Sequence, residues 1–308
     1  MNTMHAKKPS YPPSVGLDAQ FDLGQYEKIE VEPITGALGA EIRGVNLADP
    51  LSEETVAEIR QALLNHLVIF FHDQDITPDQ HIEFGRRFGE IYFNKYIPGM
   101  TEHPEINLVK KEADDIYNFG GARWHSDGSY RECPPLGTIL LAREVPIWGG
   151  DTMFCNMYLA YETLSDGMKK LLKGLISLHS AEKVFGPDGY FRSVGTVMGA
   201  EDQTPDQQFL KAVEHPVVRT HPETGCEALY VSNQYTLCFK DMSEEESKPL
   251  LDYLVDHATA PGLTCRVRWK RKTIVFWDNR CTMHFPLNDY RGQRRVMHRL
   301  TIQGDRPF

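Results

Sequence analysis

A histidine and an aspartate two residues apart are the first residues in this sequence whose types and spacing could do chemistry. They are His125 and Asp127, within Trp124-His125-Ser126-Asp127. On an extended backbone, residues i and i+2 point to the same side, so the imidazole and the carboxylate could bind one metal ion. Only His125 is paired with an aspartate, but three other histidines precede a glutamate by two residues: His81, His103 and His221. The spacing alone therefore fits a hydrogen-bonded or surface histidine as well as a ligand.

Near the C-terminus, a further histidine is followed by two arginines. The histidine is His284, and Arg295 and Arg299 follow it on the segment 294–302, where period-two alternation predicts a strand. One face of this strand would carry Arg295, Met297, Arg299 and Thr301, and the other Val296, His298, Leu300 and Ile302. The arginines would lie roughly 13 Å apart at about 3.3 Å per residue. They could face solvent on an edge strand, but inside a barrel unpaired guanidinium groups would be costly, which favours anionic ligands there.

The elements that must position these residues begin with strands. Alternating apolar and polar residues predict half-buried strands at 29–33 and 40–45. An amphipathic helix should start after Ser52, and the apolar run 66–71 is typical of a buried strand. Helices and strands therefore alternate early in the chain.

In the middle of the chain, the sequence pattern predicts a second helix, a strand, a turn and a third helix. Thr77, with Pro78 and Gln80 after it, starts a capping box, and Gly89 should end that helix. A strand at 138–141 and a glycine turn at 149–150 follow. The next helix should place four apolar residues on one face, namely Met168, Leu171, Leu172 and Leu175.

The last quarter of the chain returns to strands. A capping box at Ser243 and Glu246 opens a helix, and strands are predicted at 264–269, 273–277 and 294–302. Scattered short strands with a few helices favour a mainly β fold with flanking helices, namely a double-stranded β-helix of the jelly-roll or cupin-like type, over repeated βαβ units.

The chain organisation predicts one large domain. Residues 1–28 are rich in proline and polar residues and should form a loosely ordered arm, and residues 29–308 should form a single domain. Two segments of this domain are predicted to be lids, near 92–122 and at the glycine-rich, polar stretch 183–208.

Composition narrows the class of partner. The chain has 308 residues, 41% of them hydrophobic, and a formal net charge of −10 without any basic block, which disfavours a nucleic-acid or membrane-surface binder. No apolar run approaches about 18 residues and no signal peptide is evident, so a cytoplasmic protein is expected. The six cysteines form no C-x-x-C pair and should be reduced and mostly structural.

Taken together, these residues resemble the taurine dioxygenase-like (TauD/TfdA) family of Fe(II)/2-oxoglutarate-dependent dioxygenases, from about Ile29 to Phe308. The family pattern is His-x-Asp, a distal histidine, and an arginine eleven residues beyond it. The sequence supplies His125, Asp127, His284 and Arg295 in that order and at that offset. The resemblance implies that the first three residues bind Fe(II), and that Arg295 binds the far carboxylate of 2-oxoglutarate.

The same resemblance implies a reaction and two further contacts. The family's 2-oxoglutarate-contacting threonine falls at Thr152, where the alternative is a turn threonine that caps its own backbone, and its substrate-anion arginine falls at Arg299. Two histidines and one carboxylate on one face of the metal leave three adjacent positions open, for 2-oxoglutarate and O2. Succinate and CO2 would be co-products of hydroxylating a small carboxylate or sulfonate substrate. Cleavage of a C–O, C–N or C–S bond would follow if the hydroxylated carbon carries the heteroatom.

The substrate pocket departs from that of taurine dioxygenase. Asn94 and Ile97 stand where that enzyme has a histidine and a tyrosine, and Gly121 replaces an asparagine. Tyr92, Asn94 and Tyr96 are the candidate substrate-binding residues, with the tyrosines as an aromatic wall. The segments 246–251 and 264–270 instead resemble the aryloxyalkanoate dioxygenases.

Several alternatives remain at this stage. Taurine dioxygenase proper and an aryloxyalkanoate dioxygenase are two, and a homo-oligomer is possible. A third is a non-redox barrel protein that binds a small acid, with the His-Asp-His residues holding zinc or no metal. The oxygenase could also desaturate or decarboxylate its substrate, whereas halogenation is disfavoured because Asp127 supplies the carboxylate that a halide would replace.

Overall fold

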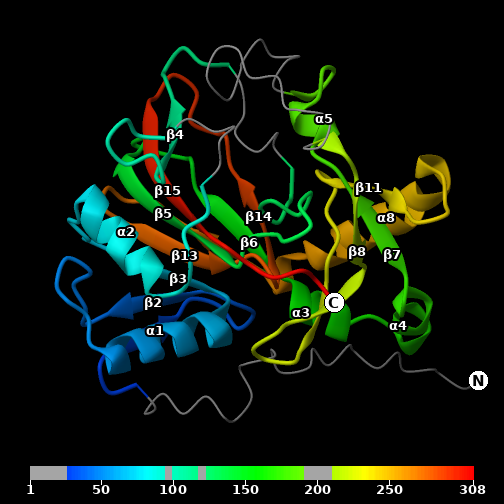
Figure 1. The fold of residues 1–308 in the computed structure, drawn as a ribbon, viewed down its shortest axis with the longest axis horizontal. Helices are drawn as coiled ribbons and strands as arrows, with labels where there is room; N and C mark the ends of the chain where they lie inside the picture. Colours follow the sequence, from blue (N-terminus) through cyan, green and yellow to red (C-terminus); the bar gives the residue numbers. More distant parts are fainter. Residues whose placement is uncertain (1–25, 94–98, 117–122, 191–209) are drawn as a thin grey trace, which may run out of the picture.

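The fold is built from two layers of strands with helices on the outside (Figure 1). The computed structural model describes residues 26–93, 99–116, 123–190 and 210–308. The predicted class, mainly β with flanking helices around a jelly-roll core, is confirmed. Within these ranges, no helix is long and apolar enough to cross a membrane.

One layer is a seven-stranded sheet that contains strands from both the N-terminal and the C-terminal part of the chain. Its strands, in spatial order, are β1 (Glu30–Pro33), β2 (Ala40–Arg43), β3 (Val68–Phe71), β13 (Ile274–Asp278), β5 (Gly137–Glu144), β15 (Arg295–Ile302) and β4 (Asn107–Lys111). All neighbours are antiparallel except β2 and β3. Because β13 and β15 flank β5, segments far apart in the sequence form the centre of this sheet.

The other layer contains three smaller sheets. They comprise β12 (Thr264–Val267), β6 (Thr152–Asn156) and β14 (Thr282–Pro286); β11 (Thr236–Phe239), β7 (Ile176–His179) and β8 (Val213–Pro216); and β10 (Glu227–Leu229) with β9 (Val218–Thr220). In the first of these sheets, β14 pairs with β6 so that His284 lies opposite Phe154.

Three of the six helices in the described residues begin at the predicted caps. The six are α1 (Glu53–His66), α2 (Pro78–Arg86), α3 (Met157–Glu162), α4 (Asp166–Leu172), α5 (Glu182–Phe185) and α8 (Glu244–Ala258), with a 3-10 turn at Pro261–Leu263. Ser52 caps α1, and the predicted capping boxes at Thr77 and Ser243 both form. These caps satisfy backbone N–H groups that the helix itself leaves unpaired.

Two helix ends differ from the prediction. The helix α2 ends at Arg86, before Gly89, and α4 ends at Leu172, so Leu175 lies outside it. Leu171 is exposed rather than on the buried face. After α4 the chain turns at Gly174, whose φ of +79° a glycine adopts without steric cost.

The two sides of β13 divide the core. Ile274 and Phe276 pack with apolar residues of α1 and α2, which cover the outer face of the large sheet (Figure 1). Val275 and Trp277 pack on the opposite side, where the Trp277 ring lies 5.5 Å from that of Phe154 on β6. A strand buried on both faces is apolar throughout, which matches the continuous apolar run in this segment.

Candidate metal centre

The three candidate ligands come from a loop and a strand that are joined through their backbones. His284 lies on β14, and His125 precedes it in sequence on the loop that leads to β5. The N–H of His125 donates to the carbonyl of His284 at 3.1 Å, and the N–H of His284 donates back at 2.8 Å. This isolated bridge holds the two imidazoles side by side, with ring centroids 4.2 Å apart.

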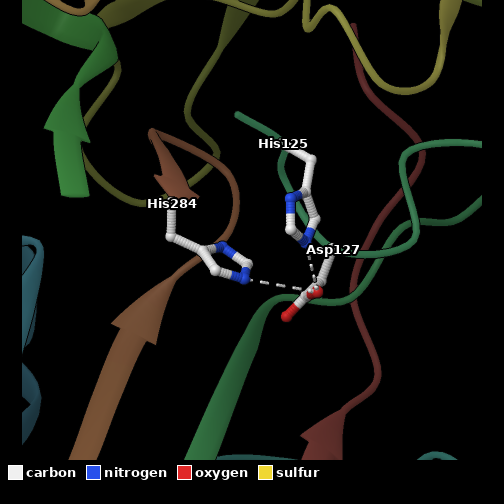
Figure 2. Close-up of side chains that lie close together, drawn as sticks. All are labelled: His125, Asp127 and His284. Carbon is white, nitrogen blue, oxygen red and sulfur yellow. Dashed lines mark ion pairs between the residues drawn. The ribbon is translucent and has the colours of Figure 1, made fainter. Parts of the chain in front are cut away.

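The side chains of the three residues converge on one point. Figure 2 shows the rings of His125 and His284 on two sides of the Asp127 carboxylate. Their Nε2 atoms lie 3.7 and 3.8 Å from the same oxygen, Asp127 Oδ1, and one ligand atom from each residue lies within 4.8 Å of the others. All three residues are buried. Two imidazoles and a carboxylate that share one face suit a divalent transition metal with open positions on its other side.

The protonation states of the two histidines favour metal binding. Burial lowers the pKa of His125, and it lowers the pKa of His284 to about 3, with a further contribution from the neighbouring His125. His125 Nδ1 lies 2.9 Å from the carbonyl of Arg123, and because a carbonyl only accepts, Nδ1 carries the hydrogen. The Nε2 lone pair of His125 therefore faces the common point.

Asp127 is held in its ionised form by an arginine on β15. Burial alone would raise the pKa of Asp127, but the guanidinium of Arg299 and the two imidazoles outweigh burial and hold this pKa well below its usual range. Arg299 Nη2 lies 2.7 Å from Asp127 Oδ2, and the hydroxyl of Thr138 donates to the same oxygen at 2.8 Å. The other oxygen, Oδ1, is thus the one that faces the histidines.

A supporting network around Asp127 was missed by the sequence analysis. The amide of Asn279 donates to Thr138 Oγ1 at 3.1 Å, and its carbonyl oxygen accepts from the backbone N–H of Asp127 at 3.3 Å and from the indole of Trp277 at 2.9 Å. Asn279 lies five residues before the candidate ligand His284. Nothing in the sequence near Thr138 indicates its role.

A pocket opens beside the three candidate ligands and contains most of the other predicted site residues. Thr152, Arg295, Arg299 and Tyr92 line it, as do residues that the sequence analysis did not select, including Tyr130, Arg131 and Tyr235. Asn94 and Tyr96 lie outside the described residues. On β15, the predicted faces are confirmed, since the arginines and Thr301 line this pocket while Leu300 and Ile302 pack in the outer core.

Arg295 is a buried cation that forms no ion pair with any residue the structure describes. It is 4% exposed, burial lowers its pKa, and its Nε has no hydrogen-bond partner among the described residues. Its guanidinium carbon lies 5.6 Å from the ring centre of Trp269, whose indole N–H donates to Thr152 Oγ1 at 3.0 Å. Burying an unpaired guanidinium costs free energy, so this end of the pocket favours binding of an anion.

A second group of potential ligands is already saturated by protein contacts. His221, Asp278 and Cys281 lie close enough to hold a metal. However, Asp278 accepts from Arg280 at 2.6 and 2.9 Å and pairs with His221 at 3.1 Å. Burial would raise the pKa of Asp278, but Arg280 and His221 outweigh it and hold the pKa far below its usual range. This cluster is an ion-pair network.

Asp278→Ala is expected to destabilise the protein by about 3–5 kcal/mol, because it leaves the buried Arg280 without its main counterion. The depressed pKa means that this stabilisation is present above the unfolded pKa of about 3.9 and is lost as the pH falls below it. Urea unfolding at neutral pH measures the loss. Glu214→Ala, which removes an exposed partner of Lys240, is the control and should cost at most about 1 kcal/mol. Equal losses for the two variants would contradict the role given to Asp278.

Comparisons with known proteins agree with this geometry. The model of the family described as "Taurine catabolism dioxygenase TauD, TfdA family" matches residues 30–301. The chain is 33% identical to an alkylsulfatase of Acinetobacter baylyi, over 91% of this chain and 86% of that protein. It is 32% identical to an alpha-ketoglutarate-dependent sulfate ester dioxygenase of Pseudomonas putida, over 91% of each chain. The crystal structure of AAD-2 in complex with Mn(II) and N-oxalylglycine superposes with a TM-score of 0.74 at 31% identity, covering 91% of this chain and 99% of that one.

Proposed function

The chain belongs to the TauD/TfdA family of Fe(II)- and 2-oxoglutarate-dependent dioxygenases, and from that premise we propose that it oxidises a small organic sulfate ester or sulfonate. His125, Asp127 and His284 would hold the iron, and Arg295 with Thr152 would bind 2-oxoglutarate. The observation that carries this proposal is the buried His-Asp-His cluster beside a pocket whose most buried arginine, Arg295, forms no ion pair with the described residues.

The donor set fits the metal and its cosubstrate. When bound, iron, 2-oxoglutarate and O2 together supply the oxidising power, and the cosubstrate is converted to succinate and CO2. N-oxalylglycine, which AAD-2 binds with Mn(II), carries the same two terminal carboxylates as 2-oxoglutarate. In this chain Arg295 would pair with the far carboxylate of 2-oxoglutarate, and this pairing would remove the cost of burying an unpaired guanidinium.

The hydroxyl of Thr152 would bind the same carboxylate. A hydroxyl has one donor and two acceptor sites, and one acceptor site of Thr152 is occupied by the indole N–H of Trp269. The O–H of Thr152 therefore remains available to donate into the pocket. Trp269 thus contacts both proposed cosubstrate residues, through this hydrogen bond and through the face of its ring beneath Arg295.

Arg299 has two functions in this proposal. Its Nη2 neutralises Asp127, while its Nε is buried without a hydrogen-bond partner among the described residues. This free donor would orient the substrate's anionic group, so that one C–H bond lies next to the metal. Hydroxylation of a carbon that carries a sulfate or sulfonate group would give an unstable product, which collapses to an aldehyde with release of sulfate or sulfite.

A spectroscopic titration tests the cofactor set. Adding Fe(II) and 2-oxoglutarate to the protein without oxygen should produce a weak visible charge-transfer band, because the cosubstrate would bind the metal next to the His-Asp-His residues. Succinate formation with O2 should then be stimulated by alkyl sulfates or sulfonates in a panel that also contains aryloxyalkanoates and N-acyl amino acids. Absence of the band in folded protein would count against the iron site, and stimulation by the aryloxyalkanoates alone would overturn the substrate class.

A further inference from the structure

Arg131 is a second cation at the pocket, and no family pattern in the sequence pointed to it. It lies four residues after Asp127, lines the same pocket as the candidate metal ligands, and is partly buried. Its guanidinium carbon lies 3.4 Å from the centre of the Tyr92 ring. Tyr92 is itself anchored, because its backbone N–H donates to the carbonyl of Thr301 on β15 at 2.8 Å. Stacking on an aromatic ring leaves the N–H edge of a guanidinium free to bind an anion.

The loop that carries Arg131 is held in place by two buried histidines of the smaller layer. His215 Nε2 lies 2.9 Å from the carbonyls of both Ser129 and Arg131, so this nitrogen is the donor. His179 Nδ1 lies 3.1 Å from the Ser129 hydroxyl, and the Arg131 N–H donates to the Gly128 carbonyl at 3.0 Å. The position of the Arg131 backbone is therefore fixed from β7 and β8 before any ligand binds.

The charges that the described residues place around the pocket leave Arg131 without a counterion. Among the described residues, the charged lining comprises one carboxylate, Asp127, and three guanidinium groups, Arg131, Arg295 and Arg299. The two charges of iron(II) and of 2-oxoglutarate cancel, so three cations minus one anion leave a net charge of +2. Arg299 is paired with Asp127, and no carboxylate in the described part of the chain forms an ion pair with Arg131. A second anion is needed to reduce this charge.

We propose that Arg131, stacked on Tyr92, binds the anionic group of the prime substrate together with Arg299 and thereby selects anions over neutral compounds. This inference rests on the proposed function and names the residue that sets its charge specificity. Apolar residues of the same pocket, among them Val184, Phe185 and Leu140, would contact the substrate's hydrocarbon part.

Calorimetric titration of hexyl sulfate, with 1-hexanol as the neutral comparison, tests the proposal without turnover. The protein is loaded with Mn(II) and 2-oxoglutarate, and binding is compared in wild type, Arg131→Gln and Arg131→Lys. Loss of a charge-assisted hydrogen bond should raise the Kd for hexyl sulfate about 10-fold or more in Arg131→Gln. Arg131→Lys keeps the charge but loses the planar stacking on Tyr92, so its Kd for hexyl sulfate should lie between those of Arg131→Gln and wild type. The Kd for 2-oxoglutarate should not change.

Arg291→Gln is the control, since Arg291 is an exposed arginine that does not line the pocket. It should bind hexyl sulfate like wild type. The proposal is overturned if wild type binds hexyl sulfate no more tightly than hexanol, or if Arg131→Gln binds it normally. A parallel rise in the Kd for 2-oxoglutarate also overturns it, because Arg131 would then support the whole pocket. Failure of wild type to bind 2-oxoglutarate with the metal would instead refute the proposed function.

Discussion

Asp127→Ala is expected to abolish substrate-dependent succinate formation, with a loss well beyond the roughly 10- to 100-fold that follows removal of an outer-shell partner. The change removes the only carboxylate within reach of His125 and His284 in the described chain. It also leaves Arg299 without its partner at 2.7 Å, so an uncompensated positive charge replaces an ion pair next to the metal position. The first effect removes a ligand and the second repels a divalent cation, so metal content should fall together with activity.

Asp127→Asn is the matched control, because it keeps the shape of the side chain and removes only its charge. Succinate analysis, metal analysis after dialysis, and thermal unfolding should be measured on both variants. We expect both to bind iron poorly, and we expect Asp127→Asn to remain folded, since its amide oxygen can still accept from Thr138 as the carboxylate does. Coupled turnover that persists in either variant would refute the assignment of Asp127 as a ligand.

Arg295→Ala is expected to raise the 2-oxoglutarate concentration needed for half-maximal activity by roughly 30-fold to more than 1,000-fold. This range corresponds to the about 2–5 kcal/mol lost when one partner of a buried charge pair is truncated. The reason lies in the position of Arg295, which is buried and lacks an anionic partner within the described ranges. The free protein should not be destabilised, because the substitution removes an unpaired buried charge.

Arg299→Ala provides the contrast within the same strand. It should chiefly weaken binding of the prime substrate and of the metal. The reason is that Arg299 contacts Asp127 and does not contact Trp269 or Thr152 in the described structure. Steady-state titrations of both cosubstrate and prime substrate, with Arg295→Lys as a charge-conserving variant, separate the two functions. The two alanine variants could instead raise the required concentrations of 2-oxoglutarate and of prime substrate equally. In that case the proposed roles, Arg295 for 2-oxoglutarate and Arg299 for the substrate, would be wrong.

Local features of the fold were predictable wherever a short pattern decides the structure. The capping boxes at Thr77 and Ser243 depend on residues only three positions apart, and both form. The alternation on β15 depends on strand geometry alone, and it correctly separates the pocket face from the core face. The end of α2 was missed, because helix termination depends on where the packed layer requires the chain to turn.

The shell around the candidate ligands could not be predicted, since its contacts join distant parts of the chain. Asn279 meets the Asp127 backbone across 152 residues, and Trp269 meets Thr152 across 117. Such pairs carry no periodic signal, and each residue alone is an ordinary polar or aromatic side chain. The proposed role of Arg131 could not be predicted for a similar reason. It depends on contacts with Tyr92 and with histidines of β7 and β8, which are remote in sequence.

By itself, the sequence determined the fold class, the family resemblance, and the candidates His125, Asp127, His284 and Arg295, because these follow from residue types at short or fixed spacings. Only the tertiary structure decided which charges are already paired. It places Arg299 on Asp127, and it leaves Arg295 and Arg131 without carboxylate partners among the described residues. Charge pairing depends on distances of a few ångströms between strands and loops remote in sequence, and those distances exist only once the two layers have packed.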